Sequence, residues 1–317
     1  MSKNFVMTKR FTLILLCCIA FAFTSCHKFE GQSVPAYIHI DSITLSCDYA
    51  TQKASTSNFT DAWVYIDDQI TGCYELPATF PILKNGPHKV SIYGGICING
   101  IGDTRSPYPF CAPKIYEQLN LVEDSIITLN PVVNYYPIGA GWNMSWNEDF
   151  ESTCSLAPTA QSDTNIIRYG GDEAWHSFNS FYSGRVALPP DSLDFCIAGE
   201  EMNFHSNLAD GYCMLEMDYN TNDTIFVGVM YYKNYQLVTH PLVKVLPTDK
   251  GHSFPQKWKK MYINLSRIIK DNVDASYFKV YFTSDLTVPD DYAQPEYHPI
   301  SEQRYYLFDN LKVLWRP

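Results

Sequence analysis

The chain has 317 residues, which exceeds an average domain of about 150 residues and indicates two domains. Acidic residues outnumber basic residues by 34 to 23, giving a formal net charge of −11, so nucleic acid is not an expected partner. Aromatic residues make up 15% of the chain, which favours strands over helices.

The N-terminus has the pattern of an export signal. Three basic residues, ending at Arg10, precede an apolar run over residues 11–23 that is broken only by Thr12. That length is typical of a signal-peptide core and falls short of the roughly 20 residues that a membrane-spanning helix needs. Residues 1–25 are therefore predicted to be a cleaved signal peptide of the lipoprotein type.

The cleavage region, Phe-Thr-Ser-Cys over residues 23–26, resembles the lipobox of bacterial lipoproteins, although Phe23 replaces the usual leucine. The resemblance implies that Cys26 is acylated, for example with palmitate, and that residues 26–33 form a lipidated tether. Each buried CH₂ contributes about 0.8 kcal/mol, so several acyl chains hold a protein on a membrane. The charged stretch after Cys26 is a weak match to surface lipoproteins of the Bacteroidetes. We expect an outer-membrane, cell-surface location, with a periplasmic face as the alternative.

A first domain is predicted over residues 34–137. Short runs of alternating apolar and polar residues recur there, each bounded by turn residues such as Asp67-Asp68. The clearest runs cover residues 37–40, 62–66, 88–93 and 125–129. Strands with this spacing predict an antiparallel sandwich.

Residues 64–90 of this domain resemble the PEGA-type β-domain of bacterial envelope proteins. A strand ends at an aspartate turn, Pro77 follows, and a Gly-x-His-x-Val strand begins at Gly86, while Asp68 stands where the family has glycine. The resemblance implies an Ig-like spacer or interaction module.

The glycine-rich segment 94–102 could be taken for a phosphate-binding loop. Such loops lead directly into a helix, whereas Pro107 and Pro109 follow here and break helices. Bends or bulges in a sheet are therefore predicted.

A second domain is predicted over residues 146–317, after a linker at 138–145. It opens on Asp-Phe-Glu at 149–151 and closes on a segment that contains Asp309-Asn310. Both ends resemble the β-jelly-roll domains found as carbohydrate-binding modules and in related Bacteroidetes surface lipoproteins. The predicted fold class is all-β, an N-terminal Ig-like β-sandwich followed by a β-jelly-roll sandwich.

A jelly roll places its first and last strands side by side, which would bring Glu148 and Glu151 near Asp309. Clustered carboxylates suit Ca²⁺, which takes six to eight oxygen ligands. The resemblance implies a structural calcium ion at these three residues. The alternative is that Asp309 and Asn310 fix a turn and that the acids are solvated.

Sugar binding requires flat aromatic faces beside hydrogen-bonding groups. Four candidates in the second domain are Trp175, Trp258, Tyr232 and Tyr235. Trp175 stands in a loop-like, glycine-containing context and is predicted to be exposed. Neighbouring strand residues face opposite sides, so only one of Tyr231 and Tyr232 should point outward. A core position for the tryptophans is the alternative.

Catalytic motifs are absent from the sequence, including nucleophile elbows, His-Glu-x-x-His and P-loops. We therefore expect a non-catalytic cell-envelope lipoprotein that binds a glycan or an envelope protein through its jelly roll. The alternatives are a structural or adhesive surface protein without a sugar site and, less favoured, a glycan-active hydrolase or lyase.

Seven of the ten cysteines remain after two leave with the signal and Cys26 is lipidated. They show no C-x-x-C pair and no regular spacing, which favours free thiols over disulfides or zinc. The seven are Cys47, Cys73, Cys97, Cys111, Cys154, Cys196 and Cys213.

Overall fold

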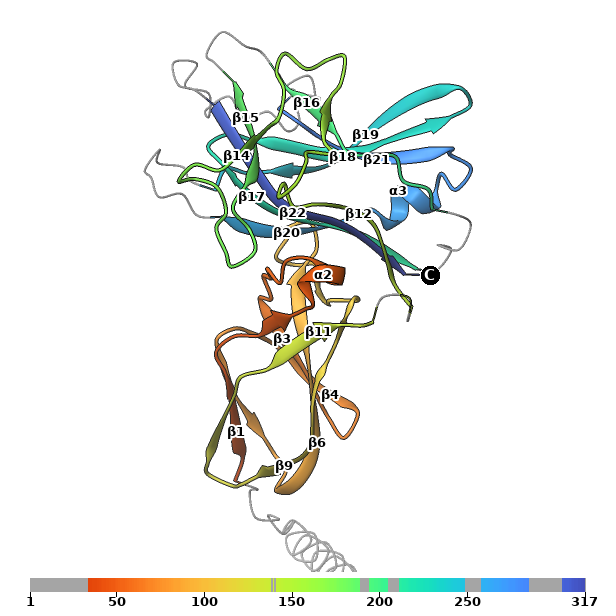
Figure 1. Cartoon of the computed structure of the whole chain (residues 1–317). Helices are drawn as coiled ribbons and strands as arrows, with labels where there is room; N and C mark the ends of the chain where they lie inside the picture. Colours follow the sequence, from red (N-terminus) through yellow and green to blue (C-terminus); the bar gives the residue numbers. More distant parts are fainter. Residues whose placement is uncertain are drawn as a thin grey trace, which may run out of the picture.

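The computed structural model describes residues 34–137, 139, 141–188, 194–204, 211–248, 258–284 and 304–316. These residues form two β-rich domains stacked end to end (Figure 1). The predicted signal peptide and Cys26 lie outside the described residues. Among those described, no helix is long and apolar enough to cross a membrane. The all-β prediction is confirmed.

The first domain is a sandwich of short strands around one hydrophobic cluster. One sheet has the order β4-β3-β6-β7, with β9 also pairing to β6, and two three-stranded sheets have the orders β10-β1-β5 and β2-β11-β8. Alternating residues such as Ile38, Val64 and Ile92 are fully buried between the layers. The elements are β1 (Ala36–Ile40), β2 (Thr44–Ser46), α2 (Tyr49–Gln52), β3 (Asp61–Ile66), β4 (Gln69–Glu75), β5 (Ala78–Ile82), β6 (Gly86–Cys97), β7 (Arg105–Pro107), β8 (Cys111–Ala112), β9 (Lys114–Leu121), β10 (Ile126–Leu129) and β11 (Val132–Tyr135).

The glycines at positions 94 and 95 lie within strand β6, so the sheet interpretation of this segment is confirmed. A Cβ atom on Gly94 would come within 2.8 Å of the Phe59 ring, and one on Gly95 would come within 2.8 Å of the Trp63 ring. Both positions need glycine because aromatic side chains pack directly against their backbone.

The second domain is a jelly roll, as its strand order shows. Eight successive strands are divided between two sheets, with the orders β15-β22-β17-β20 and β16-β21-β18-β19, and only β18 and β19 follow one another within the same sheet. β14 and β13 extend the two sheets at their edges, and β12 pairs with β22. The elements are β12 (Asn143–Glu148), β13 (Ala157–Pro158), β14 (Ile167–Tyr169), β15 (Ser183–Leu188), β16 (Cys196–Ala198), β17 (Tyr212–Thr221), β18 (Ile225–Lys233), β19 (Gln236–Val245), β20 (Lys259–Asn264), α3 (Ser266–Lys270), β21 (Tyr277–Thr283) and β22 (Arg304–Arg316). The pairing of the first strand with the last agrees with the prediction, and the predicted linker overlaps β12.

Strand alternation sorts the residues of this domain as expected. Tyr231 packs against the hydrophobic cluster between the sheets, whereas Tyr232 stacks on Tyr277. The seven described cysteines are free thiols: Cys111, Cys196 and Cys213 are buried, Cys73 is exposed, and the other three are intermediate.

The outer face of the β15-β22-β17-β20 sheet rests on the first domain (Figure 1). Met214, Tyr262 and Leu314 belong to the hydrophobic cluster of the first domain. The Asn99 N–H donates to the Tyr262 carbonyl over 2.8 Å. Apolar packing and backbone hydrogen bonds therefore join the two domains.

Candidate functional site

A cluster of buried charges lies where the jelly roll meets the first domain. Glu216 on β17, Lys260 on β20 and Lys312 on β22 all face the first domain, and each is less than 8% exposed. Lys260 Nζ lies 2.9 Å from Glu216 Oε2, and Lys312 Nζ donates to the Ala54 carbonyl over 2.6 Å. The charged side chains thus connect strands β17, β20 and β22 with one another and with the first domain.

Glu216 is also the acceptor for two tyrosines of the first domain. The Tyr135 hydroxyl donates to Oε1 over 2.7 Å, and the Tyr108 hydroxyl donates to the same oxygen. Burial alone would raise the pKa of Glu216, but Lys260, Lys312 and the two hydroxyls outweigh it and lower the pKa to about 2. Glu216 is therefore a carboxylate held by donors from both domains.

Asp218 lies two residues further along β17, at the edge of this cluster. Its Oδ2 accepts hydrogen bonds from Thr56 Oγ1 over 2.6 Å and from Asn310 Nδ2 over 2.9 Å. Lys260 Nζ lies 3.7 Å from its other oxygen. Burial raises the pKa of Asp218 despite these partners.

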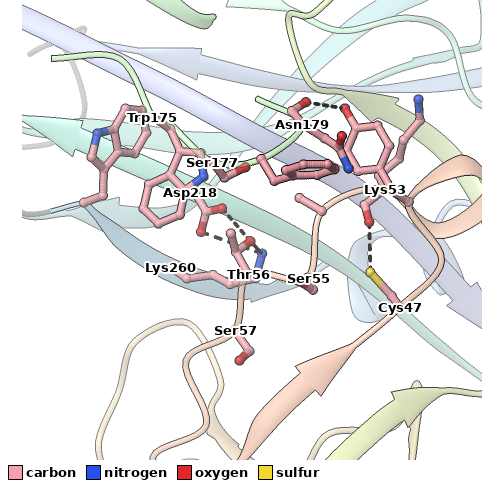
Figure 2. Close-up of a pocket in the computed structure, with 14 residues that line it drawn as sticks. Cys47, Lys53, Ser55, Thr56, Ser57, Trp175, Ser177, Asn179, Asp218 and Lys260 are labelled. Atoms are coloured by element: carbon pink, nitrogen blue, oxygen red, sulfur yellow. Dashed lines mark hydrogen bonds and ion pairs between the residues drawn. The ribbon is translucent and has the colours of Figure 1, made fainter. Parts of the chain in front are cut away.

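A pocket of about 470 Å³ opens between the domains beside Asp218 (Figure 2). The first domain contributes the segment that carries α2, and the second domain contributes a loop before β15 together with strands β17 and β20. The lining residues are Cys47, Tyr49, Lys53, Ala54, Ser55, Thr56, Ser57, Trp175, Ser177, Phe178, Asn179, Asp218, Trp258 and Lys260.

Two of the four aromatic residues predicted from the sequence meet in this pocket. The rings of Trp175 and Trp258 pack edge to face, with centroids 5.9 Å apart and an interplanar angle of 81°. Trp258 Nε1 donates to the Glu173 carbonyl over 3.1 Å. The buried Nε1 of Trp175 has no hydrogen-bond partner among the described residues. Trp175 is half-buried and not, as predicted, an exposed side chain.

Phe178, which sequence reasoning missed, is the exposed aromatic side chain at this pocket, with 91% of its surface accessible. It lies at the tip of a tight turn in which the Ser177 N–H donates to the Ser180 carbonyl over 2.9 Å. The Tyr49 hydroxyl donates to the Asn179 carbonyl over 3.0 Å and so joins the tip to the first domain. The Phe178 side chain is thus exposed to solvent on a loop that hydrogen bonds hold in place.

The buried carboxyl group of Asp309 also holds this loop in place. The Trp175 N–H donates to Ser183 Oγ over 2.8 Å, and that hydroxyl donates to Asp309 Oδ2 over 2.7 Å. Burial raises the pKa of Asp309 to about 8, with a further contribution from Asp218 and Glu151, even though the Ser183 hydroxyl and the Asn310 N–H lower it. Asp309 therefore positions the Trp175 loop.

The three acids of the predicted calcium site, Glu148, Glu151 and Asp309, accept hydrogen bonds within the fold. Glu148 accepts hydrogen bonds from the N–H groups of Phe150 and Ser155. Glu151 accepts from two further N–H groups, those of residues 181 and 182, and Asp309 is bound as described above. Among the described residues, no group of three or more His, Cys, Asp or Glu could hold a metal ion.

Tyr232 and Tyr235, the other two predicted aromatic residues, do not line the pocket. The Tyr232 ring stacks on Tyr277 with centroids 5.6 Å apart. Tyr235 is 94% exposed at the turn between β18 and β19, where it and Asn234 both have positive φ. That backbone is typical of a type I′ hairpin turn, which accounts for the exposure of Tyr235.

No protein-family model matches this chain, and no curated protein matches it. Among solved structures, the family 11 carbohydrate-binding module of Clostridium thermocellum, in complex with a β-1,3-1,4-mixed-linked tetrasaccharide, is similar at 11% identity and a TM-score of 0.34, covering 55% of this chain and 95% of that one.

Two further similar structures have comparable scores. A family 28 carbohydrate-binding module specific for non-crystalline cellulose shares 10% identity at a TM-score of 0.34, over 52% of this chain and 90% of that one. The enzymatically active domain of tailspike protein 4 from Bacteriophage CBA120 shares 8% identity at a TM-score of 0.32, over 56% of this chain and 19% of that one. These scores are too low to transfer a ligand, and the jelly-roll assignment rests on the strand order of this chain.

Proposed function

We propose that this chain is a non-catalytic saccharide-binding protein of the cell envelope and that the saccharide occupies the pocket between its domains. The observation that carries the proposal is the grouping of Trp175, Trp258 and Phe178 around that pocket, beside the Asp218 carboxylate and the Asn179 amide. Aromatic faces stack on the apolar faces of sugar rings, and carboxylates and amides bind hydroxyl groups. A volume of about 470 Å³ suits a small ligand.

The charges at the pocket favour a neutral saccharide. Two lysines line it, and each is already paired with acids: Lys53 Nζ lies 3.2 Å from Asp149, and Lys260 contacts Glu216 and Asp218. An anionic sugar would have to compete with these carboxylates. Binding is therefore expected to depend little on salt concentration, because it rests on stacking and hydrogen bonds.

Replacing either indole is expected to weaken saccharide binding. Trp175→Ala and Trp258→Ala each remove a large aromatic surface from the pocket, and we expect the dissociation constant to rise at least about tenfold. Isothermal titration calorimetry of the purified protein, with a neutral oligosaccharide selected on a glycan array, measures this change. Tyr235→Ala is the matched control, because Tyr235 is exposed outside the pocket and its loss should leave affinity unchanged.

Other results would remove the proposal. If the array and calorimetry detect no saccharide, or if both tryptophan variants bind as tightly as the wild type, this pocket is not a saccharide site. An adhesive or structural role, with the exposed Phe178 contacting a protein, would then become the better explanation.

The proposal includes a location in the cell envelope, with the protein anchored to a membrane. The lipobox at residues 23–26 supports attachment through acyl chains on Cys26. We expect Cys26→Ser to move the protein from the membrane fraction to the soluble fraction and to abolish incorporation of labelled palmitate. If the variant stays with the membrane and still takes up label, the anchor lies elsewhere. Proteolysis of whole cells then distinguishes a surface location from a periplasmic one.

A further inference from the structure

A second pocket of about 470 Å³ adjoins the first along the junction of the domains. The two pockets share three lining residues, Ser57, Trp258 and Lys260. The second is lined in addition by Asn58, Thr60, Cys97 and Gly100 of the first domain and by Tyr219, Lys259, Met261 and Tyr262 of the second. Each domain therefore contributes one side of both pockets.

The residues shared by the pockets are held in place. Lys260 Nζ donates to Thr56 Oγ1 over 3.0 Å in addition to its ion pair with Glu216. Trp258 is anchored through its indole N–H to the Glu173 carbonyl, as described above. The boundary between the pockets is therefore fixed before a ligand binds, which limits the ordering cost of binding.

Strand β20 relates the two pockets in space. Lys259, Lys260 and Met261 are consecutive on this strand, where the rise per residue is about 3.3 Å. All three line the second pocket, and Lys260 also lines the first. The two pockets therefore lie next to one another along β20.

We propose that the two pockets are successive subsites of one groove and that the ligand is a linear neutral oligosaccharide that spans both, with Trp258 at the middle. This inference rests on the proposed saccharide function. A ligand confined to the first pocket would reach only the three residues of the second pocket that the two pockets share. A chain that continues past it would also reach Thr60 and the exposed Lys259, which supply hydrogen-bonding groups for its hydroxyls.

The test is the dependence of affinity on chain length. The probes are β-1,4-linked glucose, xylose and mannose oligosaccharides of two to six units, titrated calorimetrically into the full-length wild-type protein. For the series that binds, we expect affinity to rise at least about tenfold from the shortest to the longest member. Trp258→Ala should weaken binding at every length and remove most of that rise.

A variant in the second pocket separates the subsites. Lys259→Ala is expected to weaken the longest oligosaccharides about threefold and to leave disaccharide binding unchanged, because a disaccharide is retained in the first pocket. Lys114→Ala, at an exposed position on β9, is the control and should change neither.

The outcomes distinguish the two-subsite groove from the saccharide function on which it rests. Equal affinity for all lengths, with Trp175→Ala still weakening binding, overturns the two-subsite groove and leaves the saccharide function in place. No measurable binding of any saccharide overturns both. A length effect that persists in Trp258→Ala shows that the chain extends over another surface, and this also overturns the groove.

Discussion

Lys260→Met is expected to lower the free energy of unfolding by about 3–5 kcal/mol, because it leaves buried carboxylates without their cation. Lys260 is 7% exposed and Glu216 is fully buried. With the ammonium group removed, Glu216 would keep two tyrosine donors, but Lys312 would be the nearest remaining positive charge within the described cluster. Methionine fills a similar volume to lysine. The loss of unfolding free energy therefore measures the missing charge pairing and not the creation of a cavity.

Urea denaturation monitored by tryptophan fluorescence measures this loss. Lys259→Met is the matched control, because Lys259 is the neighbouring lysine on β20 and is exposed. Its effect should stay within about 0.5 kcal/mol. Equal stability of the two variants would show that the buried charges do not hold the domains together.

The wild-type protein is expected to lose stability as the pH rises from about 4 to about 8. We expect the Asp309→Asn variant to lack this loss. The folded-state pKa of Asp309 is raised from 3.8 to about 8. Over this window the unfolded state releases a proton that the folded state retains, so the unfolding free energy falls with rising pH. A shift of this size corresponds to at most about 6 kcal/mol. Asparagine stays neutral and retains an oxygen that can accept the hydrogen bond from the Asn310 N–H.

Denaturation curves at pH 5 and pH 8 test this expectation. The wild type should be the less stable at pH 8, while Asp309→Asn should show a smaller difference between the two conditions. Burial also raises the pKa of Asp218, so Asp218 likewise makes the unfolding free energy fall with rising pH. The Asp309→Asn variant retains this contribution. Glu123→Gln, at an exposed position, is the control. Identical pH slopes in wild type and Asp309→Asn would contradict the raised pKa.

The jelly roll could be predicted because its signals are local or lie at the ends of the domain. The opening motif at residues 149–151 follows directly after β12, and the closing Asp309-Asn310 segment lies in β22, the strand that pairs with β12. The strands between them alternate in the ordinary two-residue period, as Tyr231 and Tyr232 illustrate.

The junction of the domains could not be predicted in the same way. Glu216 and Lys312 look like solvent-facing residues of their strands, because each alternates with apolar neighbours. They are buried by Tyr108, Tyr135 and Ala54, which are far away in the sequence. The one available signal is that charged residues recur on strands that are otherwise strongly apolar.

The candidate site was only partly predictable. The sequence identified the loop of Trp175 from its glycines, but exposure depends on what packs against each side chain, and Trp258 covers Trp175 while Phe178 has no such neighbour. The structure places Glu148 and Asp309 in paired strands, β12 and β22, and Glu151 just after β12. The hydrogen bonds that these acids accept from N–H groups and from the Ser183 hydroxyl depend on loop geometry, which the sequence does not reveal.

The central position of β22 has a consequence for the order of folding. This strand, Arg304–Arg316, lies between β15 and β17 and also pairs with β12. These pairings join residues that are at least 85 positions apart, so the second sandwich has a high contact order and should close slowly. During synthesis the first domain can collapse while residues 304–316 are still being made. Until they arrive, the surface that will receive Lys312 and Leu314 stays uncovered, and a chaperone has its longest opportunity to act at that stage.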